Sequence, residues 1–201
     1  MPRRLRHSSA DMRRAAGSEY LAGQLLIAMP GMADPRFQRT VIYLCAHNED
    51  GATGLVVNKL FGNITFSDLL EQLDMDAPAV GADTPVHYGG PVESGRGFVL
   101  HSTDYVREGT LVVDEEVALS ATIDILRALS NGAGPERSIL LLGYAGWGPG
   151  QLDAEIHANG WLTAPCQESL LFDPDLSAKW ERSIATLGVD PRMLSGEAGH
   201  A

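Results

Sequence analysis

The stretch SILLLGYAGWGPGQLDAEI, residues 138–156, contains the sharpest structural signal in the chain. An apolar run that is typical of a buried strand is joined here to the start of a helix. Four glycines stand between them, at positions 143, 146, 148 and 150. Glycine-rich turns between a strand and a helix bind phosphates in nucleotide-binding folds. The stretch therefore poses a choice between a phosphate loop, a catalytic turn and a structural element.

The details of the stretch argue against phosphate binding. The glycine spacing matches neither known phosphate motif, and the lysine that would pair with a phosphate is absent. Asp153 and Glu155 lie in the first turns of the predicted helix, where they would repel an anion. We interpret the segment as a structural loop clamped by the aromatic side chains of Tyr144 and Trp147, which could also line a pocket. The loop residues are Gly143, Gly146, Gly148, Pro149 and Gly150.

The flanking sequence predicts strands and helices in irregular alternation. The run RTVIYLCAH, residues 39–47, is apolar on both faces, which is typical of a central strand, and a hairpin leads from it into residues 54–59. Further strands are predicted at 21–29, 86–90, 97–102, 110–113, 138–142, 161–164 and 168–172, and helices at 68–75, 117–132, 151–159 and 176–188. This order favours an α/β fold of the α+β kind, with a mixed sheet and helices packed around it.

Composition indicates one globular domain. The chain has 201 residues, of which 44% are hydrophobic and 20% charged. We expect a basic, disordered tail over residues 1–19, or an extension ahead of a true start at Met12, and a single domain over residues 20–201. No apolar run is long enough to cross a membrane, and two cysteines are too few for a disulfide framework. A cytoplasmic location is therefore expected.

Charge separates the tail from the body. Residues 1–19 carry five arginines and two acidic residues, which leaves ten basic and twenty-four acidic residues in residues 20–201. Affinity for DNA comes largely from neutralising phosphates with lysine and arginine. The body is therefore expected not to bind nucleic acid directly.

Several pairs of reactive residues suggest chemistry but lack a partner. On a helix, Asp153 and His157 share a face and offer two metal ligands, whereas Glu155 points elsewhere. Cys45 shares a strand face with apolar residues, so it is expected in the core rather than paired with His47. His101 and Ser102 are neighbours on a strand and point in opposite directions. We therefore predict no metal site and no cofactor, and we identify no catalytic residue.

Polar residues at the ends of apolar elements are the better candidates for a binding site. They could converge on a cleft that binds a polar or anionic ligand, or they could satisfy exposed backbone groups at the strand ends. The eight candidates for such a pocket are Arg39, Thr40, Asn48, Asn58, Arg96, His101, Tyr144 and Trp147.

Four segments together resemble the YqgE/AlgH family of bacterial proteins. They are residues 23–59, beginning GQLLIAMPGMADPRF; residues 87–102, HYGGPVESGRGFVLHS; residues 143–162, GYAGWGPGQLDAEIHANGWL; and residues 187–201, LGVDPRMLSGEAGHA. The resemblance covers essentially everything after residue 19 and departs in the arginine-rich tail. It implies a compact α/β structure with a mixed, bifurcated sheet, a small barrel-like portion and surrounding helices, in a cytosolic protein. One branch of the family is named as a transcriptional regulator, and the resemblance carries over no catalytic residue or cofactor.

Two functions follow as hypotheses. The first is a non-enzymatic protein that regulates indirectly, through a protein partner or a small ligand, without contacting DNA. The alternative is a small-ligand-binding protein, or an enzyme of undefined chemistry, that uses a cleft at the strand ends. The sequence leaves the ligand, the partner and the oligomeric state open.

Overall fold

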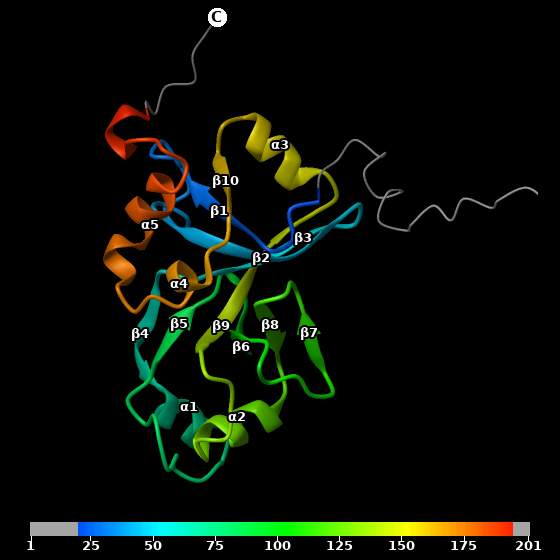
Figure 1. Ribbon diagram of the computed structural model, residues 1–201, viewed down its shortest axis with the longest axis vertical. Coiled ribbons are helices and arrows are strands. Elements are labelled where there is room, and N and C mark those ends of the chain that lie inside the picture. Colours follow the sequence, from blue (N-terminus) through cyan, green and yellow to red (C-terminus); the bar gives the residue numbers. More distant parts are fainter. Residues whose placement is uncertain (1–19, 195–201) are drawn as a thin grey trace, which may run out of the picture.

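The computed structural model describes residues 20–194 (Figure 1). Within this range ten strands form one branched sheet. The strands are β1 (Gln24–Ala28), β2 (Val41–Asn48), β3 (Gly51–Val56), β4 (Leu60–Thr65), β5 (Pro85–Tyr88), β6 (Val92–Ser102), β7 (Thr110–Val112), β8 (Val117–Ser120), β9 (Ser138–Trp147) and β10 (Trp161–Pro165). The helices are α1 (Phe66–Gln72), α2 (Ile123–Ser130), α3 (Gln151–His157), α4 (Glu168–Leu171), α5 (Leu176–Ala185) and a short 3-10 helix (Pro191–Met193).

Strand β9 belongs to both halves of the sheet. Its first half pairs in parallel with β5 and antiparallel with β6, and its last residues pair antiparallel with β3. The main path runs β10-β1-β2-β3-β9-β6-β8-β7, while β4 and β5 branch from it at β9. In Figure 1 the upper half holds β1, β2, β3 and β10, the lower half holds β4, β5, β6, β7 and β8, and β9 runs from the lower half towards β3. The expectation of a mixed, bifurcated sheet with a barrel-like portion and surrounding helices is confirmed.

Three glycines form the fork of the sheet. Gly89 bridges the two branches, because its N–H donates to Leu142 of β9 and its carbonyl accepts from Val56 at the end of β3, both at 2.8 Å. A Cβ on Gly90 would lie 2.1 Å from the carbonyl carbon of Tyr144, and a Cβ on Gly143 would lie 2.3 Å from the carbonyl oxygen of Gly90. Gly143 also has a φ of +76°, which favours glycine. The fork is thus a contact between backbones with no room for side chains.

Three apolar clusters fill the space around the sheet. Alternate residues of β2 enter different clusters: Val41, Tyr43 and Cys45 pack beneath α4 and α5, whereas Ile42 and Leu44 pack towards α3. The third cluster lies between α1, α2 and the strands β5, β6 and β9. The prediction that β2 is a central strand with both faces covered is confirmed.

The basic side chains of Lys179 and His87 are buried in the protein. Lys179 of α5 is 1% exposed and donates to the carbonyls of Leu171 and Val57, at 2.7 and 3.2 Å. Burial lowers the pKa of Lys179 to about 8. His87 of β5 is also buried, and its Nδ1 has no hydrogen-bond partner among the described residues. Burial, with a smaller contribution from the charge of Lys179, lowers the pKa of His87 to about 4.

The predicted type of secondary structure was wrong for two segments. Residues 117–120 form β8 rather than the first turn of a long helix, because Asp114 accepts the N–H groups of Glu116 and Val117 in a turn and β8 then pairs with β6. Helix α2 begins after Thr122. Residues 168–171 form α4 rather than a strand, since the carbonyl of Gln167 accepts the N–H groups of Leu170 and Leu171.

The structure continues predicted strands into flanking residues and adds a strand that was not predicted. The predicted strand 138–142 continues through the expected loop to Trp147, so that Gly143 and Gly146 lie in β9, while Gly148, Pro149 and Gly150 form the turn before α3. Strand β4 was not expected, since its residues are mostly exposed or half-buried and lack an apolar pattern. Helix α1 begins with a capping box between Thr65 and Asp68.

The predicted basic tail, residues 1–19, lies outside the described residues. Among the residues that are described, no helix combines the length and the apolar character that crossing a membrane requires.

A side chain at the fork should be far more costly than one at a comparable glycine in open space. Gly143→Ala places a Cβ against the Gly90 carbonyl, and we expect it to lower the free energy of unfolding by about 3 kcal/mol or more. Gly150→Ala is the matched control, because Gly150 has a similar φ of +69° with nothing within 4 Å. Its cost should be about 1 kcal/mol. Urea denaturation measures both, and equal costs would contradict the packing role of the fork.

The buried imidazole should make stability depend on pH. Because the pKa of His87 is lowered from 6.5 to about 4, the unfolded chain binds a proton more readily than the folded chain in this window. Its contribution to stability is therefore complete above pH 6.5 and is lost as the pH falls towards 4, with a slope of at most about 1.4 kcal/mol per pH unit. We expect His87→Leu to flatten the profile between pH 6.5 and 4 in urea denaturation. An unchanged slope in the variant would assign the acid sensitivity to other groups.

Candidate functional site

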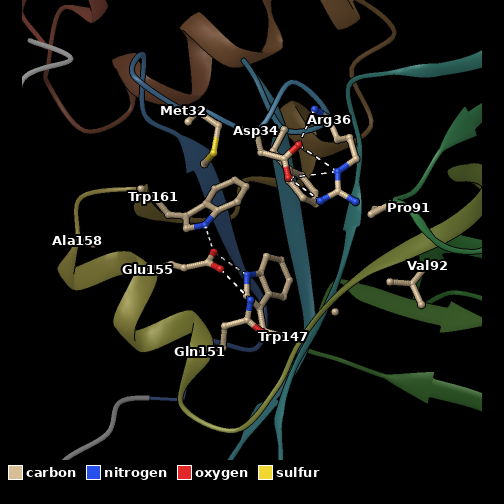
Figure 2. A pocket seen from close by; sticks show the side chains of 14 residues that line it. Met32, Asp34, Arg36, Pro91, Val92, Trp147, Gln151, Glu155, Ala158 and Trp161 are labelled. Carbon is tan, nitrogen blue, oxygen red and sulfur yellow. Dashed lines mark hydrogen bonds and ion pairs between the residues drawn. The ribbon is translucent and has the colours of Figure 1, made fainter.

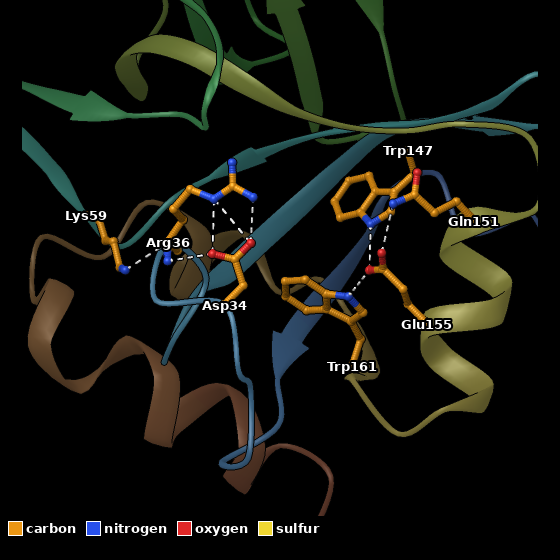
Figure 3. A network of polar contacts seen from close by, with 7 residues as sticks. All are labelled: Asp34, Arg36, Lys59, Trp147, Gln151, Glu155 and Trp161. Atoms are coloured by element: carbon orange, nitrogen blue, oxygen red, sulfur yellow. Dashed lines mark hydrogen bonds and ion pairs between the residues drawn. The ribbon is translucent and has the colours of Figure 1, made fainter.

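A carboxylate joins two tryptophans at the end of the upper half of the sheet (Figure 3). Glu155 Oε2 accepts the indole N–H of Trp147 at 3.0 Å and that of Trp161 at 2.8 Å, while Oε1 accepts Gln151 Nε2 at 2.9 Å. The two indole rings meet edge to face, with centroids 6.0 Å apart and planes at 81°. Both tryptophans are less than one tenth exposed. One carboxylate therefore fixes the orientation of two large aromatic surfaces.

The segment between the two tryptophans places Glu155 beside both indoles. Strand β9 ends at Trp147, and Gly150 begins α3 with a left-handed backbone. Gln151 lies at the first position of α3, where its Oε1 accepts the N–H of Gly148 at 3.0 Å. Gln151 and Glu155 are four residues apart and share one face of the helix. Strand β10 then begins at Trp161 and returns antiparallel to β1.

An ion pair lies in the loop between β1 and β2. Asp34 accepts from Arg36 Nε at 3.0 Å and from Nη2 at 2.6 Å, and it also accepts the backbone N–H of Arg36 at 3.0 Å. The hydrogen bonds from Arg36 lower the pKa of the Asp34 carboxyl, which therefore stays ionised. Lys59 donates to the carbonyl of Arg36 at 3.3 Å, and burial lowers the pKa of this amine.

These two groups of residues face each other across a cavity of about 450 Å³ (Figure 2). Its size is within the usual range for small-molecule sites. The indoles and α3 form one wall, and Arg36, Pro91 and Val92 stand opposite. The lining residues are Met32, Ala33, Asp34, Arg36, Phe37, Pro91, Val92, Gly146, Trp147, Gln151, Glu155, Ala158, Gly160 and Trp161.

Of the eight predicted binding residues, Trp147 lines this cavity. Arg39, Thr40 and Asn58 gather instead at the start of β2. Asn58 accepts the N–H of Val41 at 2.9 Å and donates to the carbonyl of Arg39 at 2.8 Å, and Thr40 donates to the carbonyl of Phe37. The guanidinium of Arg39 pairs with Glu181. These contacts satisfy backbone groups at the strand end, which was the alternative to ligand binding for these residues.

The remaining candidates lie in three other places. Asn48 accepts the N–H of Asp50 in the β2–β3 turn. Tyr144 packs edge to face on Phe98, and Arg96 lies over the same phenyl ring while pairing with Glu93. His101 is fully buried and contacts the hydroxyl of Ser120 and the carbonyl of Ser102, both at 2.9 Å. The structure does not bring the eight residues together, and a binding role for the seven outside the cavity stays a prediction.

The other reactive residues have structural contacts. Cys45 is buried, as expected, and burial raises the pKa of its thiol to about 12. His47 accepts the N–H of Leu21, and His157 contacts the carbonyl of Asp153. Among the described residues, no group of three or more His, Cys, Asp and Glu side chains is placed to hold a metal ion.

Sequence reasoning missed Asp34, Arg36, Glu155 and Trp161. The sequence does contain a signal for Glu155 and Trp161. Two tryptophans, Trp147 and Trp161, flank a short helix that carries Gln151 and Glu155 on one face. No local pattern connects Arg36 to that helix, because the loop at residues 29–40 and α3 meet through the pairing of β1 with β10.

Comparison with known proteins finds a matching family model and closely similar relatives. A family model described as AlgH-like matches residues 25–192. A UPF0301 protein of Rhizobium rhizogenes is 54% identical over 201 residues, covering 96% of this chain and 98% of the relative. A UPF0301 protein of Rhodospirillum rubrum is 53% identical over 182 residues, covering 90% and 95%.

Two solved structures have a similar fold. The solution structure of the AlgH protein from Pseudomonas aeruginosa superimposes with a TM-score of 0.76 at 45% identity, covering 92% of this chain and 98% of that one. A crystal structure from Corynebacterium diphtheriae has a TM-score of 0.68 at 20% identity, covering 85% and 88%, and shows similarity of fold alone.

Removing the shared carboxylate should destabilise the site more than altering its charge. Glu155→Ala leaves two buried indole N–H groups without an acceptor, so we expect the free energy of unfolding to fall by about 2–4 kcal/mol. Glu155→Gln keeps one carbonyl oxygen for both indoles and should cost about 1 kcal/mol. Urea denaturation gives the stabilities, and near-UV circular dichroism reports the packing of the tryptophans. If the two variants lost the same stability, the hydrogen bonds from the two indole N–H groups would not explain the loss.

Proposed function

The chain belongs to the AlgH-like family, whose model spans residues 25–192, and from its site we propose that it acts by binding a small organic ligand in the cavity between Arg36 and the two tryptophans. The observation that carries this proposal is the shared carboxylate, which holds two indoles in a fixed arrangement along one wall. Rigid aromatic surfaces bind ligands well because little conformational freedom is lost on binding. The wall is ordered before any ligand arrives.

The chemistry of the lining favours binding over catalysis. Among residues 20–194, no serine, threonine, cysteine or histidine that could act as a nucleophile or a neutral base lines the cavity. Of its two carboxylates, Glu155 already accepts three N–H groups. Asp34 is held ionised by Arg36 and is therefore a poor proton donor. We propose a protein that recognises its ligand without transforming it.

A regulatory role would follow from the ligand rather than from DNA. The ten basic and twenty-four acidic residues of residues 20–201 would repel a phosphate backbone. We propose that any effect on transcription is transmitted by the ligand-bound protein to a protein partner. Free Cys45 and Cys166 are consistent with a reducing compartment, which supports action in the cytoplasm.

Ligand binding should depend on Trp161 and not on the third tryptophan. We expect a thermal-shift screen of aromatic and heteroaromatic metabolites to give hits whose affinity falls at least tenfold in Trp161→Phe, since the variant loses the bond to Glu155 and part of the wall. Trp180→Phe is the matched control: Trp180 is also buried, and its N–H donates to the carbonyl of Ala28 outside the cavity. Isothermal titration calorimetry gives the affinities. A screen without hits that require Trp161 would overturn the proposal.

A further inference from the structure

Arg36 presents an unused hydrogen-bonding edge to the cavity. An arginine side chain carries five N–H groups. Asp34 engages the Nε side, through Nε at 3.0 Å and Nη2 at 2.6 Å. Among residues 20–194 no acceptor contacts the opposite edge, formed by Nη1 and the second N–H of Nη2. That edge has the planar fork geometry that binds two oxygens of a carboxylate or phosphate.

The contacts of Asp34 orient this edge rather than add much stability. The side chains of Arg36 and Asp34 are 59% and 32% exposed, and exposed ion pairs contribute little to folding. Asp34 nevertheless bonds to both the side chain and the backbone N–H of Arg36, and the guanidinium lies 5.7 Å from the centroid of the Phe37 ring. The guanidinium is therefore held in place before a ligand binds.

An aromatic surface leads from this edge to the far wall of the cavity. The Phe37 ring meets the Trp161 ring edge to face at 5.7 Å, and Trp161 meets Trp147 at 6.0 Å. All three residues line the same cavity as Arg36. A ligand that contacts Arg36 at one end would therefore rest its apolar part on these rings.

The two ends of the cavity differ in charge. Near the Arg36 end there are two cations and one carboxylate: Arg36 pairs with Asp34, and Lys59, which is not part of the cavity lining, donates to the carbonyl of Arg36. At the α3 end, the carboxylate of Glu155 is occupied by three donors. An anionic group on the ligand is thus attracted to the Arg36 end and repelled from the other, which fixes the orientation of the ligand.

We propose that the ligand is a flat, largely apolar molecule that carries an oxyanion, a carboxylate or a phosphate, bound by the free edge of Arg36. This inference rests on the proposed function of the cavity. It assigns Arg36 as the residue that selects the ligand and Asp34 as the residue that positions Arg36.

The test compares naphthalene compounds that differ in charge. By isothermal titration calorimetry, 2-naphthoate or 2-naphthyl phosphate should bind at least tenfold more tightly than the neutral 2-naphthamide, because charged hydrogen bonds are stronger than neutral ones. The stronger of the two anions identifies the oxyanion. Arg36→Lys keeps the charge and loses the fork, so it should weaken binding of the preferred anion about tenfold and change naphthamide binding less than twofold.

Arg192→Lys is the matched control for this substitution. Asp190 accepts the backbone N–H of Arg192 at 2.9 Å, its Nε at 3.1 Å and its Nη2 at 2.9 Å, so Arg192 repeats the arrangement of Arg36 outside the cavity. It should leave the affinity for every compound unchanged. If naphthamide bound as tightly as the anions, or if Arg36→Lys had no more effect than Arg192→Lys, the oxyanion inference would fail while Trp161-dependent binding could still stand. If no naphthalene compound bound, the inference would fail too. The metabolite screen with Trp161→Phe would still test ligand binding in the cavity.

Discussion

The rest of the structure depends on the backbone contact between Gly89, Gly90 and Gly143. Here β9 exchanges one partner for another: up to Leu142 it pairs with β5, and from Ala145 it pairs with β3. Gly89 bonds to both branches. The separation of the branches makes room for one core under α1 and α2 and for two more around β1, β2 and β3. It also carries the end of β9 out to Trp147, where the cavity begins.

The sequence predicted the elements whose pattern is local. The two apolar faces of β2 were visible in a few residues of the sequence, and both faces are covered in the structure. The errors arose where distant contacts outweigh local preference. Residues 117–120 pair with β6, which overrides the helical character of the residues after Asp114. Glycines 143 and 146 stay in a strand because β6 and β3 supply its hydrogen-bonded partners.

The site was predictable only in part for a related reason. Trp147 was recognised as an aromatic residue in the family motif, and it lines the cavity. Its partner Glu155 was considered for its charge and its position on a helix, whereas its role is to accept two indole N–H groups that lie eight residues before it and six residues after it. Arg36 belongs to a loop more than 100 residues away in the sequence. The polar residues at strand ends were candidates either for ligand binding or for satisfying exposed backbone groups, and several of them satisfy backbone groups there.

The environment of the two lysines has a practical consequence for chemical labelling. The chain has only Lys59 and Lys179. Lys179 is almost completely buried and its ammonium is bonded to two carbonyls, so reagents in solution cannot reach it in the folded protein. Lys59 is half-buried beside Arg36, and its lowered pKa increases the fraction of reactive free amine. Apart from the terminal amine, an amine-directed fluorophore or cross-linker would therefore attach to the folded chain beside the cavity, without any engineered cysteine.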